Sequence, residues 1–258
     1  MTTFKSTHHI ARKIVIKLGG STLEQLNAEF FQNFKALQQQ GYSVIITHGG
    51  GPAINRALAK AQIESQIIDG LRVTSEEMIH LVQGALVGEV NPYLVQQLNA
   101  AGIPAVGLNG FDHQLLQCEY LNKDLYQYVG EIKQVNTHIL DVLTAAGIVP
   151  VVACLGTSFD GQALNINGDT VASQVALAVE AESLLLVTDV AGIRIEGEYQ
   201  TEATEAIIEQ WIEEEHIYGG MIPKVRGALA CLHAGIPSVR IVNDTLTGTT
   251  ILSEELVK

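Results

Sequence analysis

The chain has 258 residues, 47% of them hydrophobic, and a formal net charge of −13 at pH 7. This length allows one large domain or two lobes. The negative charge argues against a nucleic-acid-binding protein, because a phosphate backbone attracts a basic surface. A small anionic ligand is not excluded, since a local basic cleft can exist in an acidic protein.

The cysteines and the apolar segments favour a cytoplasmic protein. Cys118, Cys154 and Cys231 are isolated from one another and have no metal-ligand spacing, so we expect reduced core residues and no protein metal site. The N-terminus lacks the apolar region of a signal peptide. No apolar run approaches the length of a membrane span, so no membrane partner is expected.

Strand and helix patterns alternate along the chain, which predicts an α/β protein whose mainly parallel sheet is covered by helices on both faces. Apolar runs typical of buried strands lie at residues 13–18, 43–48, 104–108, 149–155, 183–188 and 238–242. Helical patterns lie at residues 23–40, 52–61, 75–100, 136–146, 169–179, 203–215 and 223–234.

Two segments interrupt this alternation and suggest a division into lobes. Residues 115–135 are polar and aromatic, and we expect a β-hairpin excursion. Residues 157–167 contain a hairpin-turn signal around Gly161. We place the boundary here, with an N-terminal lobe at residues 1–156 and a C-terminal lobe at 157–258.

The long helical pattern at 75–100 has a start signal and an internal interruption. The run from Thr74 to Glu77 reads as a T-x-x-E capping box. Pro92 lies inside the pattern and should kink or split the helix.

Lys17 is the strongest indication of chemistry. It lies near the end of a strand that otherwise reads as buried, and Gly19 and Gly20 follow. A charge in such a place costs several kcal/mol without a partner. Glycines let the backbone approach an anion with exposed N–H groups, so this turn suggests a bound phosphate.

A second glycine turn, at residues 49–51, also follows an apolar strand. Pro52 suits the first position of a helix, and strand, glycines and helix N-terminus together form an anion-binding arrangement. A tight turn is the alternative, but it needs one or two glycines, not three. Neither turn is a Walker A loop or a G-x-G-x-x-G motif.

Four further residues are candidates for binding or catalysis, each with an ordinary structural alternative. Arg72 suits a carboxylate clamp or a surface ion pair. Asn165 belongs to N-I-N-G-D, in which Asp169 is either functional or a plain helix N-cap. Lys224 lies in a first helical turn, where a cation is disfavoured unless an anion is shared with the helix N-terminus.

Taken in order, six motifs make the chain resemble the amino-acid kinase family over about residues 13 to 252. The motifs are K-L-G-G, H-G-G-G-P, G-L-R-V-T, N-I-N-G-D, T-D-V-A-G-I and G-G-M-I-P-K. The resemblance is strongest to the branch that phosphorylates N-acetyl-L-glutamate in arginine biosynthesis. It implies a three-layer α/β/α sandwich with an amino-acid-binding N-terminal lobe and an ATP-binding C-terminal lobe.

The resemblance also implies residue roles. Lys17 and Lys224 would flank the transferred phosphoryl group, and Asp169 would orient both. Gly50, Gly51, Arg72 and Asn165 would bind N-acetylglutamate. The nucleotide would contact Gly19, Gly20, Asp189, Val190, Ala191, Gly192, Ile193, Arg194, His216, Ile217 and Tyr218. Mg²⁺ would arrive with ATP and be held largely by its phosphates.

The sequence departs from the family pattern at two positions. Gly168 stands where alanine is more usual, and Pro92 interrupts a helix that contributes to the family's dimer interface. About a dozen residues precede the first strand, whereas arginine-inhibited members carry an extra N-terminal helix, so we expect a homodimer without strong arginine feedback. Some relatives bind a PII-type regulator, for which this sequence shows no docking surface.

Two other functions remain open. A sister kinase would act on N-acetyl-2-aminoadipate, aspartate or an N-acylated carrier protein. A non-catalytic amino-acid sensor would be expected to have lost at least one of the charged positions.

Overall fold

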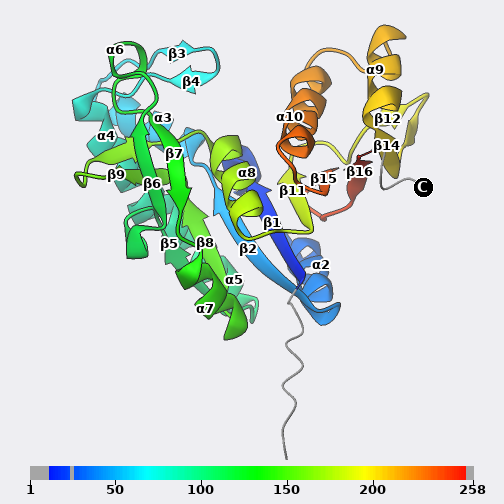
Figure 1. The fold of residues 1–258 in the computed structure, drawn as a ribbon, viewed down its shortest axis with the longest axis horizontal. Helices are drawn as coiled ribbons and strands as arrows, with labels where there is room; N and C mark the ends of the chain where they lie inside the picture. The colour runs from blue at the N-terminus through cyan, green and yellow to red at the C-terminus, as the bar shows by residue number, and fades with distance from the viewer. Residues whose placement is uncertain (1–11, 24–25, 254–258) are drawn as a thin grey trace, which may run out of the picture.

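A computed structural model describes residues 12–23 and 26–253, and helices cover both faces of its central eight-stranded sheet (Figure 1). The spatial order of the strands is β14 (Glu202–Thr204), β16 (Gly248–Leu252), β15 (Ser238–Val242), β11 (Ser183–Val187), β1 (Arg12–Leu18), β2 (Tyr42–His48), β8 (Val149–Ala153) and β5 (Ala105–Leu108). All neighbours are parallel except β15 and β16. The predicted α/β/α sandwich is confirmed, although β14 and β16 were not predicted.

The central strands consist mainly of Val, Ile and Leu, which suit strands that are buried on both faces. In β1, Val15 joins the core cluster on one face, whereas Ile14, Ile16 and Leu18 join the cluster on the other. This alternation places Lys17 on the same face as Val15.

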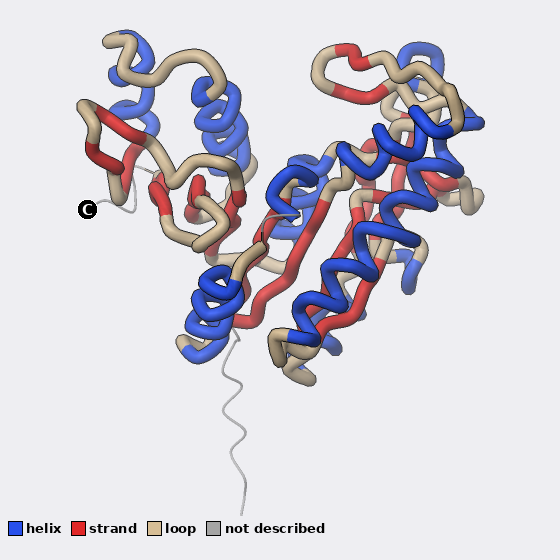
Figure 2. The backbone as a smooth tube through the Cα atoms, turned by 180° about the vertical axis from the view of Figure 1, so that it is seen from behind, coloured by secondary structure: helices blue, strands red, loops and turns tan. Residues whose placement is uncertain are grey.

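The first face, with Val15, is covered by α7 (His138–Ala145), α8 (Gly168–Ala178) and α10 (Met221–His233). The second face is covered by α2 (Ala28–Gln39), α3 (Gly51–Lys60), α4 (Glu76–Gln83), the π-helical segment η1 (Gly84–Val90) and α5 (Asn91–Ala100), and Figure 2 gives the view from behind. The short α1 (Gly20–Leu23) follows β1, and α9 (Glu205–Glu213) packs on β14 and α10.

Both predicted interruptions form hairpins in a second sheet of order β10 (Ala163–Asn165), β9 (Leu155–Ser158), β6 (Leu116–Tyr120) and β7 (Gly130–Val135). The helical turn α6 (Lys123–Tyr126) connects β6 to β7, and the 3₁₀ turn η2 (Asp112–Gln114) precedes β6. Two small hairpins complete the fold, β3 (Ile67–Ile68) with β4 (Leu71–Arg72) and β12 (Arg194–Ile195) with β13 (Glu198–Tyr199).

The long helix predicted at 75–100 is interrupted, as Pro92 indicated. Seven π-helical residues separate α4 from α5, and Pro92, the second residue of α5, follows them directly. The predicted capping box is wrong in one respect. Ser75, not Thr74, is the N-cap, and its side chain accepts a hydrogen bond from Met78 N.

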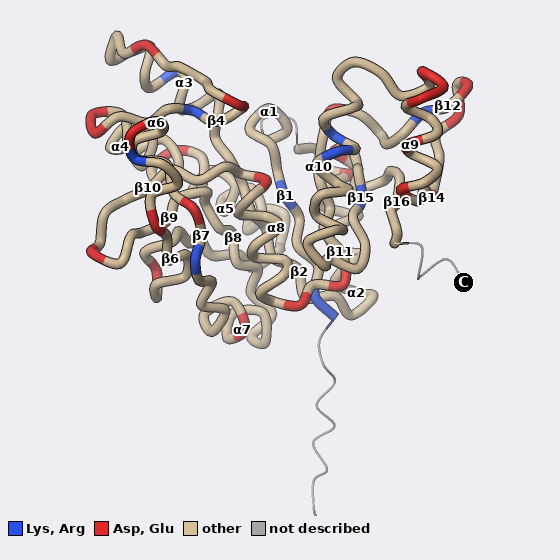
Figure 3. Tube along the Cα trace, turned by 45° about the horizontal axis from the view of Figure 1, so that its top comes forward, with Lys and Arg blue, Asp and Glu red and all other residues tan. Residues whose placement is uncertain are grey.

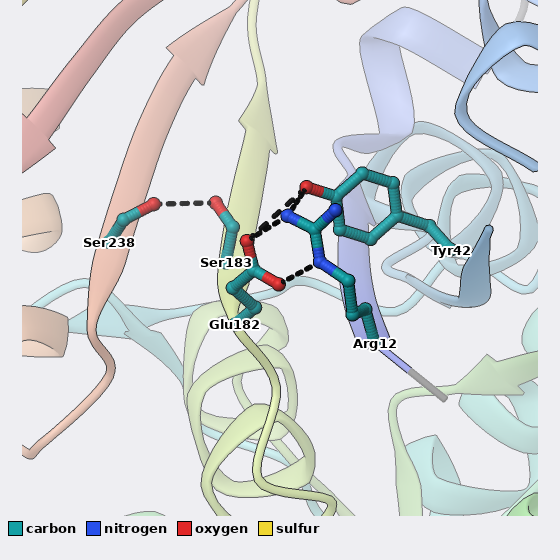
Figure 4. A network of polar contacts seen from close by, with 5 residues as sticks. All are labelled: Arg12, Tyr42, Glu182, Ser183 and Ser238. Carbon is teal, nitrogen blue, oxygen red and sulfur yellow. Dashed lines mark hydrogen bonds and ion pairs between the residues drawn. The ribbon is translucent and has the colours of Figure 1, made fainter. Parts of the chain in front are cut away.

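At the amino ends of the strands, a polar network joins β1, β2 and the start of β11 (Figure 4). The Arg12 guanidinium lies 4.2 Å from the centre of the Tyr42 ring, and its Nε donates to Glu182 at 2.6 Å. Ser238 donates to Ser183 at 2.9 Å. This network lies at the end of the sheet opposite the glycine turns. Among the described residues, no helix is long and apolar enough to cross a bilayer.

Candidate active site

The carboxyl ends of four parallel strands meet at one edge of the central sheet. Leu18 of β1 is paired in register with His48 of β2 and with Val187 of β11, and Val187 in turn with Val242 of β15. Both glycine turns begin at this edge, after β1 and after β2. Ligands of open α/β sheets bind at this edge, outside the strand ends.

Lys17 points from β1 toward the first turn of α8. Its Nζ lies 2.9 Å from Asp169 Oδ1, and only 19% of its side chain is exposed. The ion pair offsets the cost of placing an ammonium group so close to the core. Sequence analysis indicated that a buried lysine here needs a partner, and this partner is Asp169.

Lys224 approaches the same region from the first turn of α10. It forms an ion pair with Asp189, which follows β11, and this hydrogen bond holds the pKa of the Asp189 carboxyl below its usual range. The expectation that Asp169 orients both lysines needs correction. Asp169 pairs with Lys17, whereas Lys224, on the opposite side, pairs with Asp189.

The two lysines and the two aspartates line one cavity of about 360 Å³, which we call the lysine cavity. Gly19, Thr22 and Thr188 also line it. Two ammonium groups and a glycine turn around one cavity provide a site for a polyanion. Figure 3 shows basic segments on β1 and α10 on the two sides of this region, and both basic and acidic segments on the outer parts of the molecule.

A second cavity, of about 210 Å³, lies beside the first and is called here the glycine cavity. The predicted substrate residues Gly50, Gly51, Arg72 and Asn165 all line it. They come from α3 and its N-cap, the β3–β4 hairpin and β10. The fold therefore brings together four residues that are spread over more than a hundred positions of the sequence.

The Arg72 guanidinium contacts only neutral oxygens in the described part of the chain. It donates to Asn55 Oδ1 at 2.6 Å and to the hydroxyl of Ser65. Burial lowers the pKa of Arg72, because desolvation disfavours its charged form. Because its partners here are neutral, the guanidinium can still form an ion pair with the carboxylate of a ligand.

Asn165 is tied to the hairpin that carries Arg72. Its Nδ2 donates to Thr74 Oγ1 at 3.0 Å, and the Thr74 hydroxyl donates to the Arg72 carbonyl at 2.9 Å. Thr74 is fully buried. This chain of hydrogen bonds fixes β10 and β4 relative to each other on two sides of the glycine cavity.

The two cavities meet at the N-terminus of α8. Asn167 is the N-cap of this helix, and its side chain accepts hydrogen bonds from the N–H groups of Asp169 and Thr170 at 2.8 and 3.1 Å. The interpretation of Asp169 as a plain N-cap is therefore wrong, and its carboxylate is available to Lys17. Asn167 and Gly168 line the glycine cavity, and the next residue, Asp169, lines the lysine cavity.

The residues predicted to contact nucleotide are placed unevenly. Gly19 and Asp189 line the lysine cavity. Gly20 does not, and instead allows the two glycine turns to touch, since a Cβ there would lie 2.5 Å from Pro52 Cδ. The side chains of Ile193 and Ile217 are buried in the core.

The remaining predicted nucleotide residues lie beyond the lining of the lysine cavity. Val190 packs against the core, Arg194 donates to the Gly197 carbonyl, and the His216 ring lies 3.5 Å from Glu214. Tyr218 is 74% exposed. Ala191 and Gly192 continue the loop after Asp189, and a Cβ on Gly192 would lie 2.6 Å from the Thr249 hydroxyl.

Sequence reasoning missed several lining residues. No role was assigned to Thr22, Thr188 or Asn167, although Thr188 begins T-D-V-A-G-I and Asn167 lies in N-I-N-G-D, directly before a helix as an N-cap should. Cys154 and Cys231 were interpreted as core residues. They are buried as expected, but each also lines a cavity, and burial raises the pKa of Cys154 to about 12 and that of Cys231 to about 11.

Oxygen donors for a cation are present but sparse. The described residues contain no group of three or more His, Cys, Asp or Glu side chains that would hold a metal ion. Asp169 and Asp189 are the carboxylates of the lysine cavity, and each is paired with a lysine. This set suits Mg²⁺ that is coordinated mainly by ligand phosphates and water.

A parallel α/β sheet with two lysines at its carboxyl edge, and adjoining cavities for a polyanion and a carboxylate, defines the class of phosphoryl-transfer enzymes that lack a P-loop. Residues 12–243 match the amino acid kinase family. The chain belongs to this family.

Relatives and solved structures support this assignment over nearly the whole chain. The acetylglutamate kinase of Geobacillus kaustophilus is 43% identical over 253 residues, covering 95% of this chain and 98% of that protein. The crystal structure of smu.665 from Streptococcus mutans is 36% identical, with a TM-score of 0.82 and coverage of 93% and 98%. Carbamate kinase from Giardia lamblia, bound to AMP-PNP, shares the fold at 15% identity, with a TM-score of 0.65 and coverage of 95% and 99%.

Proposed function

We propose that this protein is an acetylglutamate kinase, which transfers the γ-phosphoryl group of ATP to the γ-carboxylate of N-acetyl-L-glutamate in arginine biosynthesis. The observation that carries the proposal is the junction of the two cavities. Gly168 lines one, Asp169 lines the other, and Lys17 lies beside both. A phosphoryl group held there is within reach of ligands in each cavity.

In this proposal the lysine cavity binds the ATP phosphates. Lys17 and Lys224 neutralise the charge of the migrating group from β1 and α10, and Gly19 allows the phosphates to approach the backbone. Asp169 keeps Lys17 in place. Mg²⁺, when bound, would neutralise phosphate charge, with Asp169 and Asp189 as the nearest carboxylate oxygens.

The glycine cavity binds the acceptor. Arg72 holds the α-carboxylate with two parallel N–H groups, and Asn165 binds the acetamido group. The N–H groups of Gly50 and Gly51 face the reacting carboxylate at the N-terminus of α3, where the helix dipole favours an anion.

The reaction needs positioning more than proton transfer. A γ-carboxylate oxygen attacks Pγ, a new O–P bond forms, the bond between Pγ and the bridging oxygen breaks, and ADP leaves with that electron pair. A carboxylate is already a nucleophile, so no general base is required. The lysines reduce the repulsion between the two anions.

We also propose a role for each lobe and an oligomeric state. The lobe at residues 1–156 binds the acceptor and dimerises, and the lobe at 157–258 binds ATP, with Asn165 reaching back to the glycine cavity. We propose a cytoplasmic homodimer that uses ATP with Mg²⁺ and interacts with neither nucleic acid nor membrane.

The decisive experiment measures ADP release and traps the acyl phosphate with hydroxylamine, using N-acetyl-L-glutamate, L-glutamate, L-aspartate and N-acetyl-L-2-aminoadipate. We expect turnover with N-acetyl-L-glutamate at least a hundredfold above the other acceptors, because Arg72 and the small cavity select chain length and the acetyl group. Turnover confined to the aminoadipate derivative would replace the substrate, and ligand binding without turnover would indicate a sensor.

A further inference from the structure

His48 is a buried histidine that the proposed chemistry does not use. It is the last residue of β2, directly before the glycine turn, and it is fully buried. Its Nδ1 lies 2.9 Å from the carbonyl oxygen of Gly49, and its Nε2 lies 2.9 Å from Nδ2 of Asn91. Asn91 is itself only 7% exposed.

These contacts fix the tautomer of the ring. The Asn91 Nδ2 also lies 2.9 Å from the Val151 carbonyl, which can only accept, so this end of the side chain is the NH₂ group. The Leu108 carbonyl oxygen lies further from Nδ2, at 3.5 Å, so the other hydrogen is donated to Nε2 at 2.9 Å, which must be unprotonated. The Gly49 carbonyl also accepts only, so the proton of the neutral ring is on Nδ1.

The bond to Gly49 determines the direction of the next N–H group. A trans peptide is planar, and its C=O and N–H point in opposite directions. Holding the Gly49 carbonyl with His48 therefore turns the Gly50 N–H away from the ring. This N–H has no acceptor among the described residues. Gly50 lines two cavities, one beside α1 and η1 and the glycine cavity, and the glycine cavity is the one that also contains Arg72 and Asn165.

The surrounding structure leaves this arrangement little freedom. A Cβ on Gly107 would lie 1.8 Å from Asn91 Oδ1, so only glycine leaves room for Asn91 there. A Cβ on Gly50 would lie 2.6 Å from Leu86 Cδ2 and 3.3 Å from Val90 Cγ2, both in the π-helical segment. This segment thus packs on the glycine turn, and the residue that follows it, Asn91, lies beside His48.

We propose that His48 and Asn91 are positioning residues, which together aim the Gly50 N–H into the glycine cavity to bind an oxygen of the acceptor's reacting carboxylate. The inference deepens the proposed function and rests on it. Neither side chain touches the acceptor, because both are buried behind the turn. Their effect belongs to acceptor binding and not to ATP binding.

A matched pair of substitutions tests the direction of the hydrogen bond. His48→Asn places an amide N–H close to the position of Nδ1 and keeps the donor to Gly49. His48→Gln carries its amide further out, near the position of Nε2, and loses this donor. We expect His48→Gln to raise the KM for N-acetyl-L-glutamate at least tenfold with the KM for ATP within twofold, and His48→Asn to stay within threefold of the wild type.

Equal losses in both variants, or a change in the KM for ATP as large as that for the acceptor, would mean a merely structural role and overturn the proposal. Thermal unfolding of both variants establishes that they fold. Turnover of the wild type is measured first. Its absence would reject the proposed function, and the tautomer of His48 would then be tested by the spectra described next.

A second measurement needs no variant. Long-range ¹H–¹⁵N spectra of the wild-type protein should show His48 protonated on Nδ1, and the Gly50 amide proton should move downfield as N-acetyl-L-glutamate is added. A proton on Nε2, or a Gly50 amide that does not respond to a turned-over acceptor, would contradict the inference even if neither variant folds.

Discussion

At the scale of single residues, Lys17 and Lys224 are two cations that enter one cavity from different parts of the fold. Replacing either with alanine should lower kcat about 10²- to 10³-fold, because each stabilises charge on the migrating group. The Kd of N-acetyl-L-glutamate, measured by calorimetry, should stay within threefold, since Arg72 remains.

The controls for this prediction are cations in the same elements that face elsewhere. Lys13, also in β1, pairs with Asp141 at 2.7 Å, and Arg226, also in α10, pairs with Glu209. Lys13→Ala and Arg226→Ala should leave kcat within twofold. Normal turnover of both active-site variants would reject the proposed mechanism.

Gly168 lies where the two cavities meet, and its place can accommodate a larger residue. A Cβ there would lie 3.6 Å from both Lys17 Cε and Cys154 Sγ, which is ordinary van der Waals contact. Gly168→Ala should therefore raise the free energy of unfolding by about 0.5–1 kcal/mol, because the unfolded chain loses conformational freedom.

Denaturant unfolding measures this effect against Gly110→Ala. At Gly110 a Cβ would lie 2.4 Å from the Leu155 carbonyl, so this variant should be destabilised. A Gly168→Ala protein that is less stable than the wild type would show that the N-terminus of α8 is more crowded than the structure indicates.

His48 should make the protein sensitive to acid. Burial lowers the pKa of His48 from its ordinary 6.5 to about 4. Between these values the unfolded chain binds the proton and the folded protein does not, so stability falls as pH decreases from about 6.5 toward 4. The loss reaches about 3 kcal/mol at the acid end of this window, where 1.36 kcal/mol corresponds to one pKa unit.

Urea unfolding at pH 7 and at pH 4.5 measures this contribution. The wild type should lose about 2–3 kcal/mol more than His48→Asn between the two pH values, because asparagine does not titrate. Equal losses would mean that His48 is protonated in the folded protein.

At the scale of elements, the π-helical segment η1 is the feature that sets the position of Asn91. Gly107→Ala should displace Asn91 from His48 and from the Val151 carbonyl, and overpacking of this kind costs about 1–3 kcal/mol. Gly84→Ala is the matched control, since a Cβ there meets open space and alanine favours the helix.

Thermal unfolding of these two variants tests the role of Gly107. A melting temperature of Gly107→Ala equal to that of the wild type would mean that Asn91 moves without loss. The hydrogen bonds that Asn91 donates to His48 and to the Val151 carbonyl would then contribute little to stability.

At the scale of the whole molecule, the proposed homodimer can be tested at two exposed apolar side chains. Val87 and Tyr93 are 36% and 44% exposed on neighbouring turns of η1 and α5, the region that the family resemblance assigns to the dimer interface. Sedimentation should give twice the 27.8 kDa mass of the chain for the wild type, and a smaller value for the Val87→Glu/Tyr93→Glu variant.

The control for this prediction is Phe159→Glu. Phe159 is 62% exposed at the turn between β9 and β10, and its replacement should leave the dimer unchanged. A wild-type monomer, or a dimer that the Val87→Glu/Tyr93→Glu variant keeps, would move the interface elsewhere. The residues before β1, on which the expectation about arginine feedback depends, lie outside the described part of the chain.

The sequence predicted most of the fold because its strands are strongly marked. Mainly apolar runs identified six central strands, and the polar segments between them identified both hairpins. β16 was missed because its adjacent Thr249 and Thr250 make it look polar, and β14 because three residues carry too little pattern. The break near Pro92 was predictable from the missing N–H, but the π-helical turns before it were not.

The sequence by itself determined which residues are chemically unusual: a lysine in a buried strand, three consecutive glycines and an arginine near a capping signal. Only the tertiary structure decided how they are paired. Asp169 lies beside Lys17, and Asn91 beside His48, across separations of 152 and 43 residues. The local sequence pattern indicates the conformation and burial of a segment. The partner of a hydrogen bond or ion pair depends instead on which elements the packing of the core brings together.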